Sequence, residues 1–240
     1  MLRMLMPVVG RFRSLVLPVG FLALVSSSAH AQVGFPPAES PYRDQKIGQT
    51  LSILGGQLFV RRDPANVAPD AAPMFGARYD VAVGGPSVMY VRYQMSPSER
   101  RRLLPSQPLA TRLEGTPSVT THIFDLGLDI ALTGRKTWRY LMPSVTGGIG
   151  LASDFQNADA GGYKFGTKFT VTYGAALRYI PPGRISYRLD LTNYYWQYQY
   201  PDAYFIPTSD ETSVLTDTKQ RNSWRGNWGL TAGLSWQLFR

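Results

Sequence analysis

The chain has 240 residues, a formal net charge of +9 and no cysteine. This length suits a single domain, and the lack of cysteine excludes a fold that is closed by disulfides. The basic excess is modest and forms no continuous basic stripe, so the composition does not favour nucleic-acid binding.

The first 31 residues are predicted to be a cleavable signal peptide. Arg3, Arg11 and Arg13 form a positive segment, residues 15–25 are an apolar run, and residues 29–31 read Ala-His-Ala, which matches a cleavage site. An uncleaved N-terminal membrane anchor is the alternative. Cleavage would leave an exported chain with a net charge of +6. No later apolar run is long enough for a spanning helix.

Residues 32–49 are rich in proline and charge, and we expect them to be a periplasmic linker. The remainder, residues 50–240, is expected to form one domain. Within it, eight segments alternate apolar and polar residues as strands do. These segments are 51–60, 74–83, 87–95, 119–132, 138–152, 164–179, 184–198 and 222–240. Gly55 and Gly56 interrupt the first alternation, which predicts a bulge and leaves the facing of that strand open.

The connections between these segments alternate between long and short. Residues 84–86, 133–137 and 181–183 are short turns, whereas residues 96–118 and 199–221 are long. Outer-membrane barrels combine an even number of strands with short periplasmic turns and longer extracellular loops. The sequence therefore predicts an all-β, eight-stranded, antiparallel up-and-down barrel, with both termini in the periplasm.

Aromatic residues lie near the ends of the apolar faces, and those faces carry no charge. Aromatic girdles of this kind mark the two boundaries of a lipid bilayer. The predicted extracellular girdle contains Phe75, Tyr93, Phe165, Tyr195, Trp224 and Trp228. The predicted periplasmic girdle contains Tyr140, Tyr179, Tyr187 and Trp236. A soluble barrel with its apolar face inside is the less favoured alternative.

The polar faces carry small residues together with charges of both signs. An eight-stranded interior is narrow and must be filled by side chains, and buried charges must be paired. We therefore predict an ion-pair network that plugs the lumen. A small or gated pore is the alternative. The network is expected to contain Arg78, Asp80, Arg92, Asp125, Asp129, Lys168, Arg178, Arg188, Asp190 and Arg225.

The last strand ends in an aromatic-rich segment that contains Leu234, Trp236, Leu238 and Phe239. It is similar to the signal that the barrel assembly machinery reads. With the strand count and the loop asymmetry, it makes residues 47–240 resemble the small eight-stranded outer-membrane barrels of the OmpA-like transmembrane type. The resemblance implies a monomer in contact with lipid and lipopolysaccharide, without a C-terminal peptidoglycan-binding domain. Arg240, after the terminal aromatic, departs from the pattern.

Residues for catalysis or for cofactor or metal binding are scarce. His122 is the only histidine after the leader, and only Ser118 lies nearby as a nucleophile, so no enzyme activity is predicted. The basic cluster at residues 99–102 could bind lipopolysaccharide phosphates or be a solvated charge run. The aromatics at residues 200–205 could contact another surface or extend the barrel. The predicted role is structural or surface interaction, and the alternatives are a small channel and a soluble periplasmic ligand-binding barrel.

Overall fold

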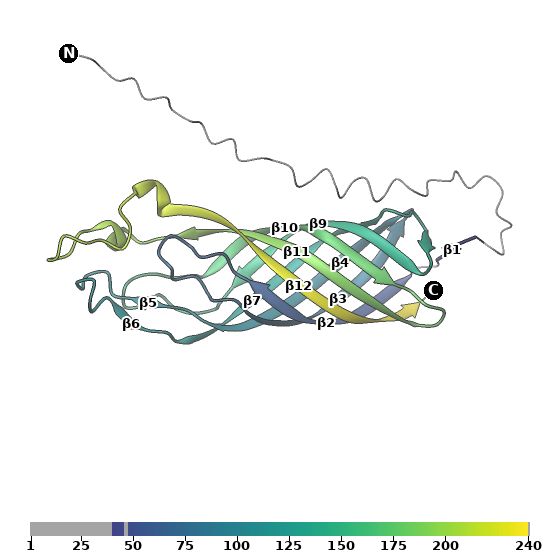
Figure 1. Cartoon of the computed structure of the whole chain (residues 1–240), viewed down its shortest axis with the longest axis horizontal. Coiled ribbons are helices and arrows are strands. Elements are labelled where there is room, and N and C mark those ends of the chain that lie inside the picture. The colour runs from purple at the N-terminus through teal and green to yellow at the C-terminus, as the bar shows by residue number, and fades with distance from the viewer. Residues whose placement is uncertain (1–39, 46–47, 240) are drawn as a thin grey trace, which may run out of the picture. The chain divides into compact units, whose positions relative to one another are not determined.

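The computed structural model describes residues 40–45 and 48–239. The predicted signal peptide (1–31) and most of the predicted linker lie outside the described residues. Eight antiparallel strands form a closed barrel, because each pairs with the next and the last pairs with the first (Figure 1). They are β2 (Gln49–Phe59), β3 (Ala72–Gly84), β4 (Ser87–Glu99), β7 (Ser118–Ala131), β9 (Leu141–Ser153), β10 (Thr167–Tyr179), β11 (Ile185–Gln199) and β12 (Asn222–Phe239). The predicted all-β up-and-down barrel is confirmed.

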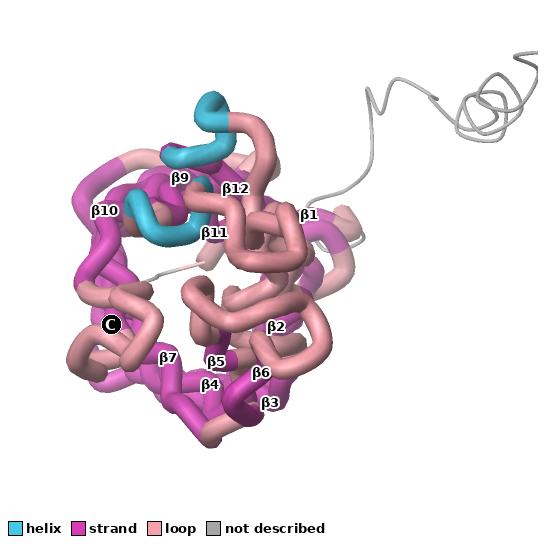
Figure 2. Tube along the Cα trace, turned by 90° about the vertical axis from the view of Figure 1, so that its left-hand side faces the viewer, coloured by secondary structure: helices cyan, strands magenta, loops and turns pink. Residues whose placement is uncertain are grey.

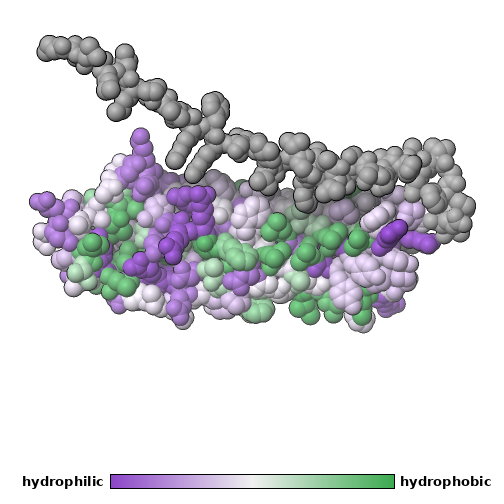
Figure 3. Space-filling view, viewed as in Figure 1, coloured by the Kyte–Doolittle hydropathy of each residue, from purple (hydrophilic) through white to green (hydrophobic). Residues whose placement is uncertain are grey.

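The alternation along each strand separates an apolar exterior from a polar interior. In β2, Leu51 and Ile53 are exposed on the outside, whereas Thr50 and Ser52 are buried inside. All the other barrel strands repeat this arrangement, so large apolar side chains cover the outer surface along the strands (Figure 3). Exposed apolar area of this extent needs an apolar surrounding.

The bulge predicted at Gly55 and Gly56 is wrong. Both glycines pair in regular register with β3 and with β12. Gly56 faces inward at a point where strands approach closely, since a Cβ there would lie 2.0 Å from the carbonyl oxygen of Leu230. In the pairing of β2 with β12, the register shift lies instead in β12, between Gln237 and Phe239. This irregularity leaves Leu238 and Phe239 both exposed.

Several short elements were not predicted. β1 (Tyr42–Asp44), in the supposed linker, pairs with β8 (Lys136–Trp138) at the turn end of the barrel. β5 (Arg102–Leu103) pairs with β6 (Leu113–Gly115) in a long loop. The last loop contains the 3-10 helices η2 (Asp202–Phe205) and η3 (Thr218–Arg221).

The long loops gather at one end of the barrel. Seen from this end, they lie across the ring of strands (Figure 2). We call residues 60–71, 100–117, 154–166 and 200–221 together the loop crown. Among the described residues, no helix is both long and apolar enough to cross a membrane.

The neighbouring glycines of β2 give a matched test of barrel closure. Gly56→Ala should strongly reduce the folded fraction, because its Cβ would collide with the β12 backbone. Gly55→Ala should fold normally, because the nearest atom to its Cβ is a Phe75 ring carbon at 3.9 Å. Folding into lipid vesicles can be followed by the shifted gel mobility of the unheated barrel. Equal folded fractions would contradict the close approach of β2 and β12.

Candidate functional site

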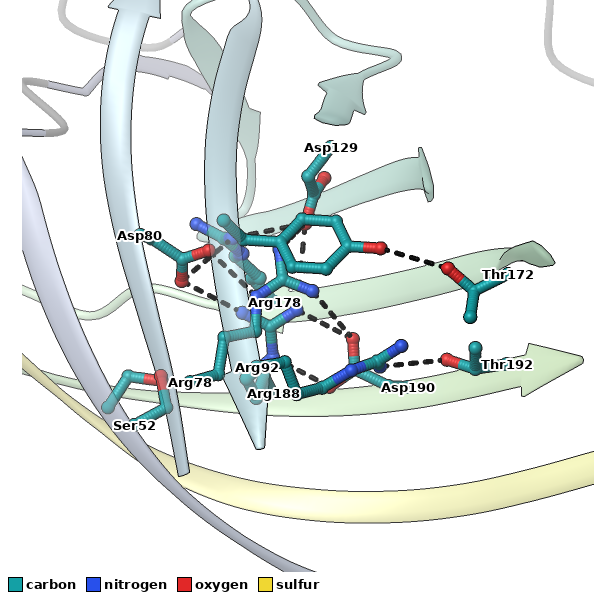
Figure 4. A network of polar contacts seen from close by, with 12 residues as sticks. Ser52, Arg78, Asp80, Arg92, Asp129, Thr172, Arg178, Arg188, Asp190 and Thr192 are labelled. Carbon is teal, nitrogen blue, oxygen red and sulfur yellow. Dashed lines mark hydrogen bonds and ion pairs between the residues drawn. The ribbon is translucent and has the colours of Figure 1, made fainter. Parts of the chain in front are cut away.

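The centre of the lumen holds three arginines and three aspartates. Arg78 (β3), Arg178 (β10) and Arg188 (β11) reach from different walls, because an eight-stranded barrel is narrow enough for side chains to meet across it (Figure 4). Their partners are Asp80 (β3), Asp129 (β7) and Asp190 (β11). We call these six residues the central cluster.

Every member of the central cluster has more than one oppositely charged neighbour. Arg78 contacts Asp80 through Nε and Asp129 through Nη2, both at 2.7 Å. Arg188 holds Asp190 with two hydrogen bonds of 2.6 Å, donated by Nε and Nη2. Arg178 donates to Asp129 at 3.1 Å and lies 3.3 Å from Asp80. The cluster therefore links four strands through charge-assisted hydrogen bonds.

A second ion pair lies beside the central cluster. Arg92 donates from Nε and Nη2 to the two carboxylate oxygens of Asp125, at 2.9 and 2.8 Å, and from Nη1 to Thr192 at 3.0 Å. Tyr90 donates to Asp125 at 3.2 Å, and its ring lies 3.9 Å from the Arg78 guanidinium carbon. Tyr90 thus joins the two sets of charges by a hydrogen bond and a cation–π contact.

The eight charges balance within a buried volume. Four guanidinium groups face four carboxylates, and none of these eight side chains is more than 6% exposed. Because each charge has partners of the opposite sign, burial does not leave an isolated ion, which would cost several kcal/mol. We call these eight residues with Tyr90, Thr172 and Thr192 the lumen network.

The structure brings together eight of the ten charged residues that the sequence placed in the lumen. Lys168 and Arg225 lie near the loop ends of β10 and β12 and make no ion pair with the described residues. Sequence reasoning missed the roles of Tyr90, Thr172 and Thr192. The alternation placed these side chains on inward faces, but the sequence does not indicate which charged group a neutral side chain contacts.

An aromatic core lies at the loop end of the barrel. Tyr163, Tyr200 and Tyr204 are buried and stack with ring centroids 6.0–6.2 Å apart. They belong to a larger buried group whose other aromatic members are Phe165, Tyr194, Trp196 and Tyr198. Tyr200 and Tyr204 are therefore part of the loop crown's interior and are not an exposed contact surface.

Phe165 corrects the predicted extracellular girdle. It is 1% exposed and packs edge-on against Trp196, with ring centroids 6.0 Å apart. The reason is local. Gly166 has a φ of +63°, so the extended conformation of β10 starts only at Thr167 and the outward alternation does not continue back to Phe165.

The basic cluster at residues 99–102 is also changed by the structure. Arg100 is 1% exposed and holds Asp159 through two hydrogen bonds of 2.6 Å. Burial lowers the pKa of Arg100, but the hydrogen bonds and charge of Asp159 outweigh it, so the net shift is upward. Arg102 lies 3.3 Å from the same carboxylate. Arg100 is thus a structural residue of the loop crown and is not free to meet a phosphate.

His122 and Ser118 do not form a catalytic pair. They lie four residues apart on the outward face of β7, which separates them by about 13 Å. His122 Nδ1 is hydrogen-bonded to the Tyr93 hydroxyl at 2.7 Å. Among the described residues, no group of His, Cys, Asp or Glu could hold a metal ion.

The remaining predicted girdle residues lie on the outer surface at the two ends of the barrel. At the loop end, Tyr195 stacks on Trp224, with ring centroids 5.2 Å apart. At the turn end, Tyr179 contacts both Tyr140 and Tyr187 at 6.3 Å. The other exposed aromatics of the predicted set are Phe75, Tyr93, Trp228 and Trp236.

These features together define the class. A closed eight-stranded antiparallel barrel with an apolar outer band, aromatic ends and a filled polar interior is the fold of the small OmpA-like outer-membrane barrels. This conclusion follows from the strand pairing and surface of the chain itself.

Comparison with known proteins gave low similarity. No protein-family model and no curated protein matches the chain. The N-terminal β-barrel domain of Pseudomonas aeruginosa OprF is 12% identical, with a TM-score of 0.46, over 80% of this chain and 98% of that one. The Yersinia pestis outer membrane protein Ail in a phospholipid bilayer nanodisc is 14% identical, with a TM-score of 0.38, over 79% and 99%. Ail in complex with the heparin analogue sucrose octasulfate is 15% identical, with a TM-score of 0.33, over 80% and 100%.

The central cluster predicts unequal costs for two neighbouring substitutions. Asp190→Ala should lower the free energy of unfolding by about 3–5 kcal/mol, because it leaves Arg188 without its two shortest hydrogen bonds. Thr192→Ala removes only one acceptor of Arg92 and should cost about 1 kcal/mol. Urea unfolding in lipid vesicles, followed by tryptophan fluorescence, measures both losses. Equal losses would show that the ion pairs do not stabilise the barrel.

The loop crown is expected to lose stability at high pH. Burial raises the pKa of Tyr163 and of Tyr204, and burial together with the Asp63 carboxylate raises that of Tyr200. An unfolded tyrosine titrates near pH 10. The stability linked to these phenols is therefore fully present below about pH 10 and is lost as the pH rises through the higher folded values.

Tyr204→Phe tests this dependence with little change in packing, because the Tyr204 hydroxyl has no hydrogen-bond partner among the described residues. Loop proteolysis measured from pH 8 to pH 12 should begin at a higher pH in Tyr204→Phe than in the unaltered protein. Tyr187→Phe, an exposed residue at the turn end, is the control. The same alkaline onset in both variants would mean that the buried phenol does not set it.

Proposed function

We propose that this protein is an integral barrel of the bacterial outer membrane with a closed lumen, and that it serves as a structural and surface-interaction protein. The observation that carries the proposal is the lumen network, in which charges of both signs are paired and buried across the barrel. A permeating ion would have to break several of these contacts at once, and each broken buried pair leaves an uncompensated charge.

Two further layers support a closed barrier. The aromatic core fills the loop end above the lumen network. At the turn end, residues near the start of β2 are tied to the turns of the barrel: Gln45 donates its backbone N–H to the Arg135 carbonyl, and the Gly48 carbonyl accepts from the backbone N–H of Ala82. Gln45 also lines the same cavity as Arg178, a member of the central cluster.

The loop crown is built as a preorganised surface. Arg112, buried between two loops, donates to the carbonyls of Thr212 and Ser213 and to the hydroxyls of Thr208 and Thr212. The backbone N–H of Leu109 donates to Asp210 at 2.8 Å. Loops tied to one another lose little conformational entropy on binding, which favours a role in surface contacts.

The rest of the proposal concerns placement and biogenesis. The exposed segment with Leu234, Trp236, Leu238 and Phe239 would be read by the barrel assembly machinery, and both termini would lie in the periplasm. The protein would be a monomer in contact with lipid and lipopolysaccharide. Catalysis is not part of the proposal, because the candidate pair that the sequence offers, Ser118 and His122, lies too far apart for proton transfer.

Conductance in planar bilayers tests the closed lumen. The folded protein, identified by its shifted gel mobility, should give no discrete current steps, whereas a porin in the same bilayer verifies the assay. Reproducible steps from the folded protein would overturn the barrier and favour the alternative of a small or gated channel. Extraction from membranes by salt without detergent would contradict residence in the bilayer altogether.

A further inference from the structure

A cavity of about 780 Å³ lies at the loop end of the barrel wall. The residues that line it come from the starts of β3 and β7, the end of β4 and the segment that follows β9. Its lining residues on β4, Pro97 to Glu99, lie four to six residues beyond the girdle residue Tyr93. That distance is about 10–14 Å along the membrane normal, so the cavity lies outside the apolar band.

The lining of this cavity is negatively charged, although the chain as a whole has an excess of basic residues. Asp70, Glu99 and Asp154 are among the lining residues, and no lysine or arginine is. None of the three carboxylates forms an ion pair with the described residues. Asp70 donates its backbone N–H to the Glu99 carbonyl at 2.8 Å, so these two residues lie side by side. We call the cavity with these three carboxylates and Phe155 the acidic groove.

Asp154 is the residue that points to a ligand. It lines the cavity and is 3% exposed, and its Oδ1 accepts from the backbone N–H of Gln156 at 3.1 Å. Its Oδ2 has no hydrogen-bond partner among the described residues. Two cations lie nearby, but both Nη atoms of Arg100 are held by Asp159, and Lys168 forms no ion pair with Asp154. A buried carboxylate oxygen without a partner costs free energy, so the fold alone does not explain this residue.

An exposed aromatic ring follows this carboxylate in the chain. Phe155 is 75% exposed, and its ring centroid lies 5.1 Å from that of His122. Its φ of +51° is uncommon for a residue other than glycine, and its backbone N–H donates to Ser153 Oγ at 3.2 Å. Because the face of an aromatic ring attracts an ammonium group, the ring and the carboxylate suit the same kind of ligand.

The negative charges lie at two ends of the acidic groove. Glu99 pairs in register with Ser118 at one end, whereas Ser153 pairs with His122 at the other. Ser118 and His122 are four residues apart on β7, and Asp154 is one residue closer to the first end than Ser153 is. About 10 Å of strand therefore separates the two ends.

We propose that the acidic groove binds a linear polyamine, an aliphatic chain whose amines are protonated at neutral pH. A chain of three amines joined by three- and four-carbon spacers is about 11 Å long when extended, which matches the separation of the acidic ends. One terminal ammonium group pairs with Asp70 and Glu99. The other contacts Asp154, whose carboxylate turns about its soft last torsion, and the face of the Phe155 ring.

Two other kinds of cation fit the acidic groove less well. Among the described residues, no group of His, Cys, Asp or Glu could hold a metal ion. An extended basic peptide needs partners for its backbone, but Pro73 and Pro97 in the lining have no N–H to donate. The cavity volume also lies in the range of small-molecule sites. A small, flexible polycation is therefore the ligand that these observations favour.

The test is binding of spermidine to the folded protein in detergent at low salt, measured by isothermal titration calorimetry. Asp154→Asn should weaken binding roughly tenfold, the equivalent of one charge-assisted contact. Glu99→Gln, at an exposed position, should weaken it roughly threefold. Glu211→Gln changes an exposed acid that does not line the groove. It is the matched control and should bind as the unaltered protein does.

Stability measurements separate a binding role of Asp154 from a structural one. Without spermidine, Asp154→Asn should leave the unfolding midpoint unchanged or raise it, because Oδ2 has no partner to lose. Spermidine should raise the midpoint of the unaltered protein and not that of Asp154→Asn. A lowered midpoint of Asp154→Asn together with an unaltered spermidine affinity would make Asp154 a structural residue and would overturn the site.

Other ligands test the assignment to a polyamine. Putrescine, a diamine about 6 Å long that cannot join the two ends, should bind at least tenfold more weakly than spermidine, and so should Mg²⁺. Equal binding of putrescine, Mg²⁺ or a trilysine peptide would overturn the assignment. Equal spermidine affinity of Asp154→Asn, Glu99→Gln and Glu211→Gln would overturn the site itself.

The inference rests on the proposed function only in placing the acidic groove on the outer side of the membrane. Binding is a property of the folded barrel, so it is measured without a membrane. Failure of the unaltered protein to fold into vesicles would count against the proposed function, and gel mobility reports that separately.

Discussion

The narrow interior of an eight-stranded barrel is the constraint on which the rest of this structure depends. A bilayer requires every backbone group to be paired, which the closed circle of strands achieves. Eight strands leave an interior just wide enough for side chains, so it must be filled rather than left open. This chain fills it with four arginines and four aspartates, so the filling carries no net charge. Each guanidinium group is paired, because it meets a carboxylate from another strand.

Small inward residues are the counterpart of the long charged ones. A Cβ at Gly127 or at Gly148 would lie 2.8 Å from the Tyr90 hydroxyl, which donates to Asp125 at 3.2 Å. The two glycines pair with each other across β7 and β9, and so they make room on one wall for a ring that comes from β4. The glycine-rich polar faces are thus part of the same packing solution as the arginines.

The sequence predicts best the features that follow from the two-residue alternation of a strand. The eight strands, the facing of all but the first, and the inward position of residues such as Arg78 and Asp129 follow from alternation, since successive side chains of a strand point to opposite sides. Partners across the lumen do not follow, because they depend on the stagger between distant strands. That is why the contact of Arg178 with Asp80, from opposite walls, could not be assigned from the sequence.

The loop crown shows where alternation stops being informative. Phe165, Tyr200 and Tyr204 carry the same residue types as a membrane girdle, but they lie beyond the strand ends, where one residue with positive φ or one 3-10 turn changes their direction. The structural role of Arg100 was missed for a related reason. A run of charged residues does not indicate a partner such as Asp159, which lies 59 positions later in the chain.

The requirement that polar groups away from water have hydrogen-bond partners acts on both surfaces of the barrel wall and gives opposite results. Inside, polar groups are numerous and paired, so the lumen network stabilises the fold and its individual charges need no external partner. Outside, the side chains along the middle of the strands are apolar, as Leu126, Leu189 and Leu230 are, because lipid offers no hydrogen-bond partners.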